Sequence, residues 1–269
     1  MKKYFLLVTT SIIIVSCLLF SSCKKTIHYP HPSPGGVRLA SYSLVGTSTY
    51  TAPATAPTSY SENDNYAFSY DTLNRLVFIV FTTNNPFKAN TDASFIYSND
   101  TIYKITTSET PSILLERDTF IVNSLNQIVT AYTPNTTTTF QYFQNLLTIM
   151  NVTNEATNTT ISNSYTSQVG NFLQNTSTNS TNPLQNFTYY TAYTNTIGDY
   201  LQINSFTMYG YNVYQYANQV HTITTPGVSA TTVSYNIDAY SNILSTTATT
   251  IGQSGSDTTT VYNFQYESY

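Results

Sequence analysis

The residues that could carry acid–base or metal chemistry are few in this sequence. Of 269 residues, 9 are Lys or Arg, 13 are Asp or Glu and 3 are His. His28 and His31 lie in a proline-rich segment that could not hold a catalytic geometry rigidly, and the strand pattern around His221 predicts a solvated ring. The motifs of zinc proteases, serine hydrolases, P-loop sites and EF-hands are absent. We predict no catalytic residue, no metal site and no cofactor.

Paired carboxylates are the one catalytic arrangement that the composition leaves open. Glycoside hydrolases use two acids held about 5–9.5 Å apart. The acids available for such a pair lie mostly near predicted turns: Glu62, Asp64, Glu109, Glu116, Asp118, Glu155 and Asp199. Spacing singles out no two of them, and turn chemistry accounts for most of the Asp residues. A carboxylate-pair glycoside hydrolase is therefore the least favoured alternative.

Tyrosine is the residue type best suited to binding, with 25 Tyr beside 14 Phe and no Trp. Tyr gives rigid contact area, while Asn, Thr and Ser give adaptable hydrogen bonds. Rings can stack on sugars, and the densest group of candidate ligand-binding residues is Tyr189, Tyr190, Tyr193, Tyr209, Tyr211 and Tyr214. The alternative is that these rings form the core of a β domain or pack between neighbouring strands.

The overall charge excludes two classes of protein. Charged residues make up 8% of the chain, against about 25% in ordinary domains, and the formal net charge is -4. Too few basic residues are present to neutralise a row of phosphates, so nucleic acid is not an expected partner. Charge-rich disorder is also excluded, because it requires high net charge and few aromatic residues.

The amino-terminal segment has the organisation of a signal peptide over residues 1–22. A basic start is followed by an apolar run from Tyr4 to Phe20, which is short for a spanning helix of about 20 residues. Ser21-Ser22-Cys23 resembles the lipobox of bacterial lipoproteins, with Phe20 where that family prefers Leu. The resemblance implies lipid attachment at Cys23, so that the partner is a membrane. The expected location is the outer membrane, on its surface or its periplasmic face.

Three alternatives to this lipid anchor remain. Cys17 is a rival acceptor, although cleavage there would leave an apolar amino terminus. An ordinary signal peptidase site and an uncleaved anchor helix are the other two. After Cys23, a Pro- and Gly-rich tether over residues 23–36 is predicted to be semi-extended, because Pro fixes φ and biases its preceding residue.

From residue 37 to 269 the chain is predicted to be a single all-β repeat domain. Aromatic or aliphatic residues alternate with Thr, Ser and Asn, which places the rings on one face of a sheet. Short turns containing Asn separate these runs, and anchors recur at roughly 20–30 residues, enough for two strands and two turns. Outside the signal peptide, no stretch of ten residues shows convincing helical periodicity.

The clearest repeat is Tyr70-Asp71-Thr72-Leu73-Asn74-Arg75-Leu76. It resembles the signature of YD repeats, known from RHS-like shells, with Asn in place of Gly. Such hairpins also occur in uncharacterised Bacteroidota-type lipoproteins whose tether begins Ser-Cys-Lys-Lys, as residues 22–25 do here. The resemblance implies a meander of antiparallel hairpins and supplies no activity.

The predicted sheet must bury its aromatic face without helices to cover it. It could be a curled sheet, a sandwich or a partly open barrel. A membrane-spanning barrel also alternates, but it needs strands of about 10 residues, and short turns interrupt this sequence often. We expect a lipid-anchored protein of the cell envelope that acts as a non-catalytic binding or structural module. Its partners would be a glycan or another envelope protein. A carrier of a hydrophobic ligand is the alternative.

Overall fold

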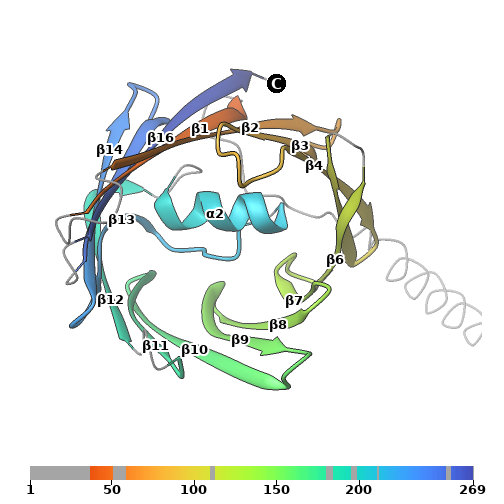
Figure 1. Ribbon diagram of the computed structural model, residues 1–269. Coiled ribbons are helices and arrows are strands. Elements are labelled where there is room, and N and C mark those ends of the chain that lie inside the picture. The colour runs from red at the N-terminus through yellow and green to blue at the C-terminus, as the bar shows by residue number, and fades with distance from the viewer. Residues whose placement is uncertain are drawn as a thin grey trace, which may run out of the picture.

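The chain forms a closed β-barrel with a helix in its interior (Figure 1). The computed structural model describes residues 37–50, 59–109, 113–179, 184–194, 199–210, 212–252 and 256–268. The predicted signal peptide, the tether and Cys23 lie outside these residues, so those predictions stand as made. The elements are β1 (Val37–Tyr50), β2 (Ser59–Tyr70), β3 (Leu76–Thr83), β4 (Thr91–Ser98), β5 (Thr101–Ser108), β6 (Leu114–Val122), β7 (Ile128–Tyr132), β8 (Thr136–Phe143), β9 (Leu146–Asn154), β10 (Thr159–Gln168), β11 (Asn171–Ser177), β12 (Leu184–Thr194), α2 (Tyr200–Tyr209), β13 (Asn218–Thr225), β14 (Ser229–Ile237), β15 (Ile243–Gly252) and β16 (Ser256–Ser268).

Each strand pairs with the next one along the chain, and all pairs are antiparallel. The predicted all-β antiparallel meander is therefore confirmed. Its closure is complete: β1 pairs with β16 from Val37 opposite Ser268 to Tyr50 opposite Ser256. Because neither edge is left unpaired between these two strands, the barrel has no open seam there.

The strands alternate between an apolar interior and a polar exterior, as the sequence pattern predicted. On β2, Phe68 is buried while its neighbours Ala67 and Ser69 are exposed. On β14, Val233 is buried between exposed Thr232 and Ser234. Successive side chains of a strand point to opposite faces. Aromatic residues such as Phe68, Phe120 and Phe172 are therefore buried in the interior, whereas Tyr103 and Tyr132 are exposed.

Three turns at one rim of the barrel share a hydrogen-bond pattern. In each, the side chain of the first residue accepts from the backbone N–H groups two and four residues further on, at 2.8–3.0 Å; these first residues are Asp71, Asn123 and Asp238. The fourth residues adopt left-handed backbone conformations: Asn74, Asn126 and Ser241. Asn tolerates this conformation, which explains how it replaces Gly in these turns.

The residue after each of these turns is buried and fixes a tyrosine on the adjoining strand. The backbone carbonyls of Leu76, Ile128 and Ile243 accept hydrogen bonds at 2.7–2.9 Å from hydroxyls of Tyr97, Tyr142 and Tyr266. A buried hydroxyl requires such a partner. The repeat in the sequence therefore corresponds to a repeated packing unit around this rim.

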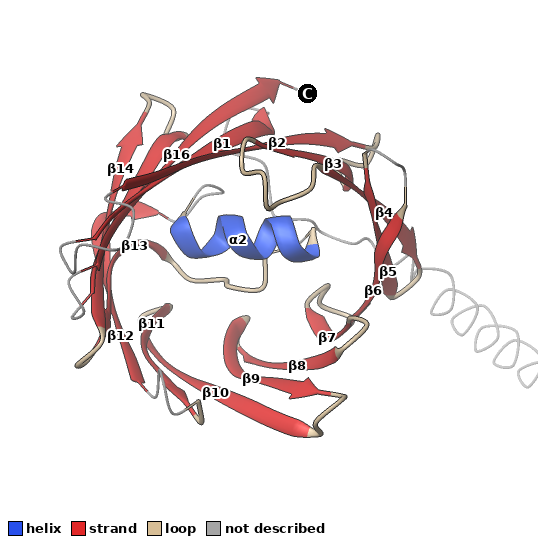
Figure 2. Ribbon diagram, in the orientation of Figure 1, coloured by secondary structure: helices blue, strands red, loops and turns tan. Residues whose placement is uncertain are grey.

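The expectation that no helix covers the aromatic face is wrong, because α2 lies inside the barrel (Figure 2). Asp199 caps its amino terminus by accepting from the Leu201 N–H, and Gly210 ends it with φ of 65°. An added Cβ at Gly210 would lie 2.7 Å from the Phe95 ring. The buried positions of the helix are Gln202, Ile203, Ser205 and Phe206, so polar and apolar residues share the packed side and its sequence lacks the apolar stripe of a surface helix. None of the described helices is long and apolar enough to span a membrane.

Candidate functional site

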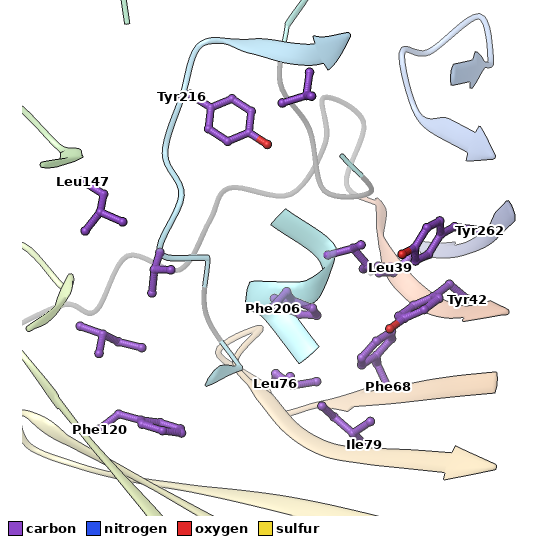
Figure 3. Close-up of a cluster of buried hydrophobic side chains, with 14 of the residues drawn as sticks. Leu39, Tyr42, Phe68, Leu76, Ile79, Phe120, Leu147, Phe206, Tyr216 and Tyr262 are labelled. Atoms are coloured by element: carbon purple, nitrogen blue, oxygen red, sulfur yellow. The ribbon is translucent and has the colours of Figure 1, made fainter. Parts of the chain in front are cut away.

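The interior helix packs against one wall of the barrel, formed by β16, β1 and β2 and called here the helix-packed wall. The Phe206 ring meets Phe68 edge-on, with ring centroids 5.5 Å apart. The hydroxyls of Thr207 and Tyr42 are hydrogen-bonded at 3.0 Å. Figure 3 shows Phe206 beside Phe68 and Tyr42, with Phe120 on a separate part of the barrel. Edge-to-face ring packing of this kind adds to the stabilisation from burial.

Asp199 anchors the start of the helix to the barrel. Its carboxylate is fully buried and accepts from the Tyr216 hydroxyl, from the Tyr235 hydroxyl at 2.8 Å and from the Val220 N–H at 2.9 Å, besides the Leu201 cap. Burial raises the pKa of Asp199, and the four donors act in the opposite direction. The carboxylate thus joins α2 to β13 and β14.

A cavity of about 410 Å³ lies between α2 and the opposite strands β6–β9, called here the cavity wall. This volume falls within the range of about 300–1,000 Å³ that is usual for small-molecule sites. The lining is mostly apolar and includes Phe120, Ala131, Met150 and Val152 from the wall and Met208 and Tyr209 from the helix. Since Tyr209 contacts Phe120 and Phe140 at ring distances of 5.4 and 5.7 Å, the helix bridges the barrel there and leaves the cavity beside it.

Asp118 on β6 is the charged residue that lines this cavity. It is 4% exposed, and its Oδ1 has no hydrogen-bond partner. The Oδ2 lies 3.6 Å from the Nζ of Lys104, which donates to the Met208 carbonyl at 3.1 Å. Burial raises the pKa of Asp118 to about 6; the ammonium of Lys104 opposes the shift and the nearby Glu116 carboxylate adds to it. The cavity therefore contains an acid that the protein leaves incompletely paired.

The structure brings two of the six predicted ligand-binding tyrosines to this cavity, Tyr209 and Tyr214. Tyr189 packs against Tyr216 with ring centroids 5.5 Å apart. Tyr190 donates to the Val233 carbonyl at 2.9 Å and lies against the His221 ring. His221 is half-buried by this contact, instead of fully solvated as its strand pattern predicted.

The two remaining predicted tyrosines cannot be compared in the same way. Tyr193 lies in β12, and its side chain is outside the described part of the structure; Tyr211 lies outside it altogether. Binding by all six residues stays a prediction.

Sequence reasoning did not single out Lys104 or Met150. The available signal was on β6, where Glu116 and Asp118 alternate in phase with Phe120 and so share its inward face.

Two of the other candidate acids form ion pairs away from the cavity. Glu62 and Asp64 on β2 both form ion pairs with Lys88, the latter at 2.9 Å, and Asp64 also accepts from the Thr83 hydroxyl at 2.5 Å. Among the residues that the structure describes, no three His, Cys, Asp or Glu gather as metal ligands would. The site best supported by geometry is thus the cavity.

Comparison with known proteins supports the fold. No protein-family model and no curated protein matches the sequence. The structure is similar to the crystal structure of a porin-like protein from Bacteroides uniformis, with a TM-score of 0.63 and 15% sequence identity; the match covers 89% of this chain and 100% of that chain. At this identity the likeness shows a shared porin-like barrel fold, while the resemblance to YD-repeat lipoproteins stays a prediction.

Proposed function

We propose that this protein is a lipid-anchored, non-catalytic binding protein of the outer membrane whose barrel stands in water and holds a small hydrophobic ligand in its interior. The observation that carries the proposal is the mostly apolar cavity of about 410 Å³ between α2 and β6–β9. The anchor would be Cys23, and the tether over residues 23–36 would separate the barrel from the bilayer. Two acyl signals are enough for stable anchoring.

The outer surface of the barrel supports a position in water. Membrane-spanning barrels have an outward apolar band about 25 Å tall and a polar interior. Here Asn63 and Asn65 on β2 and Ser234 and Asn236 on β14 are exposed, and the interior is apolar. Arg117 is exposed in the middle of β6. On the lipid face of a membrane-spanning barrel, an Arg near the bilayer midplane destabilises the fold by about 2–4 kcal/mol. Exposed Ile96, Tyr103 and Ile251 lie on other strands, so the described outer surface is mixed in polarity.

A hydrophobic ligand fits this cavity better than a glycan does. A sugar needs an open ring face and several polar partners, whereas Tyr209 and Tyr214 are packed among other rings. Apolar cavities exclude water, and small apolar molecules bind in them. A catalytic role would need a second acid facing Asp118 across the cavity, and Asp118 is the one acid in the cavity lining.

The ligand is tested by extracting the purified full chain with organic solvent and identifying what is released by mass spectrometry. We expect an apolar molecule from the natural sequence. Ala131→Phe, which fills the cavity, should abolish its recovery. Thr130→Phe, one residue away on the outward face of β7, should not. Equal recovery from both variants would contradict the proposal.

The anchor and the aqueous position need separate measurements. Intact-mass analysis should give a chain that begins at Cys23 and carries acyl chains; an unmodified amino terminus would contradict the anchor. After limited proteolysis within residues 24–36, we expect the released barrel to remain in solution without detergent. A released barrel that still required detergent would support a membrane-spanning body instead.

A further inference from the structure

The acid in the cavity indicates which hydrophobic ligands fit. Asp118 is 4% exposed, and its Oδ1 lacks a hydrogen-bond partner. Among the described residues that line the cavity, the others are either apolar or polar without a charge. Leaving a buried, charged acceptor without a donor is unfavourable. A ligand that donated to this carboxylate would compensate for the incomplete pairing when it bound.

The charges around Asp118 favour a cationic donor over a neutral one. Glu116 lies two residues away on the same strand face, and Lys104 is the one cation paired with Asp118 in the described structure. Its Nζ is 3.6 Å from Oδ2, longer than a hydrogen bond, and one of its three N–H groups donates to the Met208 carbonyl. Two carboxylates and one ammonium leave this part of the interior with net negative charge.

We propose that the cavity takes an amphipathic amine: an apolar body against Met150, Val152 and Ala131, with a protonated amino group donating to the carboxylate of Asp118. This inference rests on the proposed function, since it requires that the cavity bind a ligand at all. Charge-assisted hydrogen bonds are about twice as strong as neutral ones. The head group therefore determines selectivity, and the apolar lining supplies most of the affinity.

Three molecules with one alkyl chain separate these contributions: dodecylamine, dodecanol and dodecanoate. Binding to the full chain is measured by equilibrium dialysis in a nonionic detergent, with protein-free micelles as the blank. We expect dodecylamine to bind about tenfold more tightly than dodecanol, and dodecanoate to bind most weakly. Ala131→Phe should abolish specific binding of all three.

Variants of the acid give the second arm. Asp118→Asn should lower dodecylamine affinity about tenfold and leave dodecanol affinity unchanged. The matched control Asp100→Asn lies in an exposed turn and should change neither. Lowering the pH below the pKa of Asp118 should weaken dodecylamine binding in the natural chain; the other titratable groups that face Asp118 are Lys104, Glu116 and Tyr209.

The possible outcomes separate the two proposals. Equal affinity for the three molecules, or tightest binding of dodecanoate, would overturn the amine while leaving a hydrophobic cavity site. Absence of specific binding by any of them would contradict the proposed function as well. The comparison among ligands uses the natural chain, so it remains decisive even if Asp118→Asn does not fold.

Discussion

The helix-packed wall and the cavity wall of this barrel are built from the same alternating pattern but meet the interior helix differently. At β16, β1 and β2, rings from wall and helix are in direct contact. At β6–β9, Tyr209 of the helix contacts two rings, Phe120 and Phe140. Beside these contacts, smaller or flexible side chains such as Ala131, Thr138 and Met150 leave a cavity. The position of α2, rather than the alternation of the strands, therefore decides which part of the interior is available to a ligand.

The largest expected effect is loss of the anchor that holds α2 to one side. Asp199→Ala removes the acceptor of four donors, namely the hydroxyls of Tyr216 and Tyr235 and the N–H groups of Leu201 and Val220. Because each of these buried donors loses a hydrogen bond to a carboxylate, the free energy of unfolding should fall by at least about 4 kcal/mol. Guanidinium unfolding followed by circular dichroism measures it. Asp238→Ala, in a turn at the rim, is the control with the smaller loss; an equal loss would refute the anchoring role.

Two faces of the same helix give the next comparison. Phe206 is buried against the helix-packed wall, and Phe206→Ala should cost about 3–5 kcal/mol. Met208 is 55% exposed and lies beside the cavity, so Met208→Ala should cost less than about 1 kcal/mol. Denaturant midpoints of the two variants check this. Similar costs would mean that both walls are packed alike.

Enlarging a small residue should be tolerated at the cavity wall and should destabilise the fold next to the helix-packed wall. Ala131→Leu extends into the cavity and should change stability by less than about 0.5 kcal/mol, because space for the added carbons exists. Ala248 on β15, next to the helix-packed wall, is buried away from the cavity, so Ala248→Leu should cost about 1–3 kcal/mol. Thermal unfolding of both variants, without added ligand, distinguishes the walls.

The smallest expected effect is the pH dependence of the free energy of unfolding that Asp118 on the cavity wall contributes. The pKa of Asp118 is raised to about 6, above the usual value of about 3.9. Between these values the folded chain holds this proton more tightly than the unfolded chain. Asp118 therefore contributes fully to the free energy of unfolding below about pH 4. This contribution is lost as the pH rises through 6, which lowers the free energy of unfolding by roughly 1–3 kcal/mol. Asp118→Asn should flatten the stability curve in this window; an unchanged slope would assign it to other groups.

Sequence reasoning anticipated the class, the faces and the turns of the barrel, because these depend on neighbouring residues. Alternation determined which rings face inward, as at Phe68, and Asn74 adopted the left-handed conformation expected of it. Closure was not predictable, since the register between β1 and β16 joins residues at opposite ends of the chain. The cavity depends on where Asp199 holds α2, through contacts with Tyr216 and Tyr235 that no local pattern reveals.

The pairing of β1 with β16 also has a kinetic consequence. It joins residues as distant as Arg38 and Glu267, which are 229 positions apart, so closing the circle requires nearly the whole chain. Contacts of such long range form slowly, because the entropy of the intervening loop must be lost first. During synthesis, β1 therefore keeps one edge unpaired until β16 has been made. A chain stopped before Ser256 would expose two such edges, ready to pair with another copy.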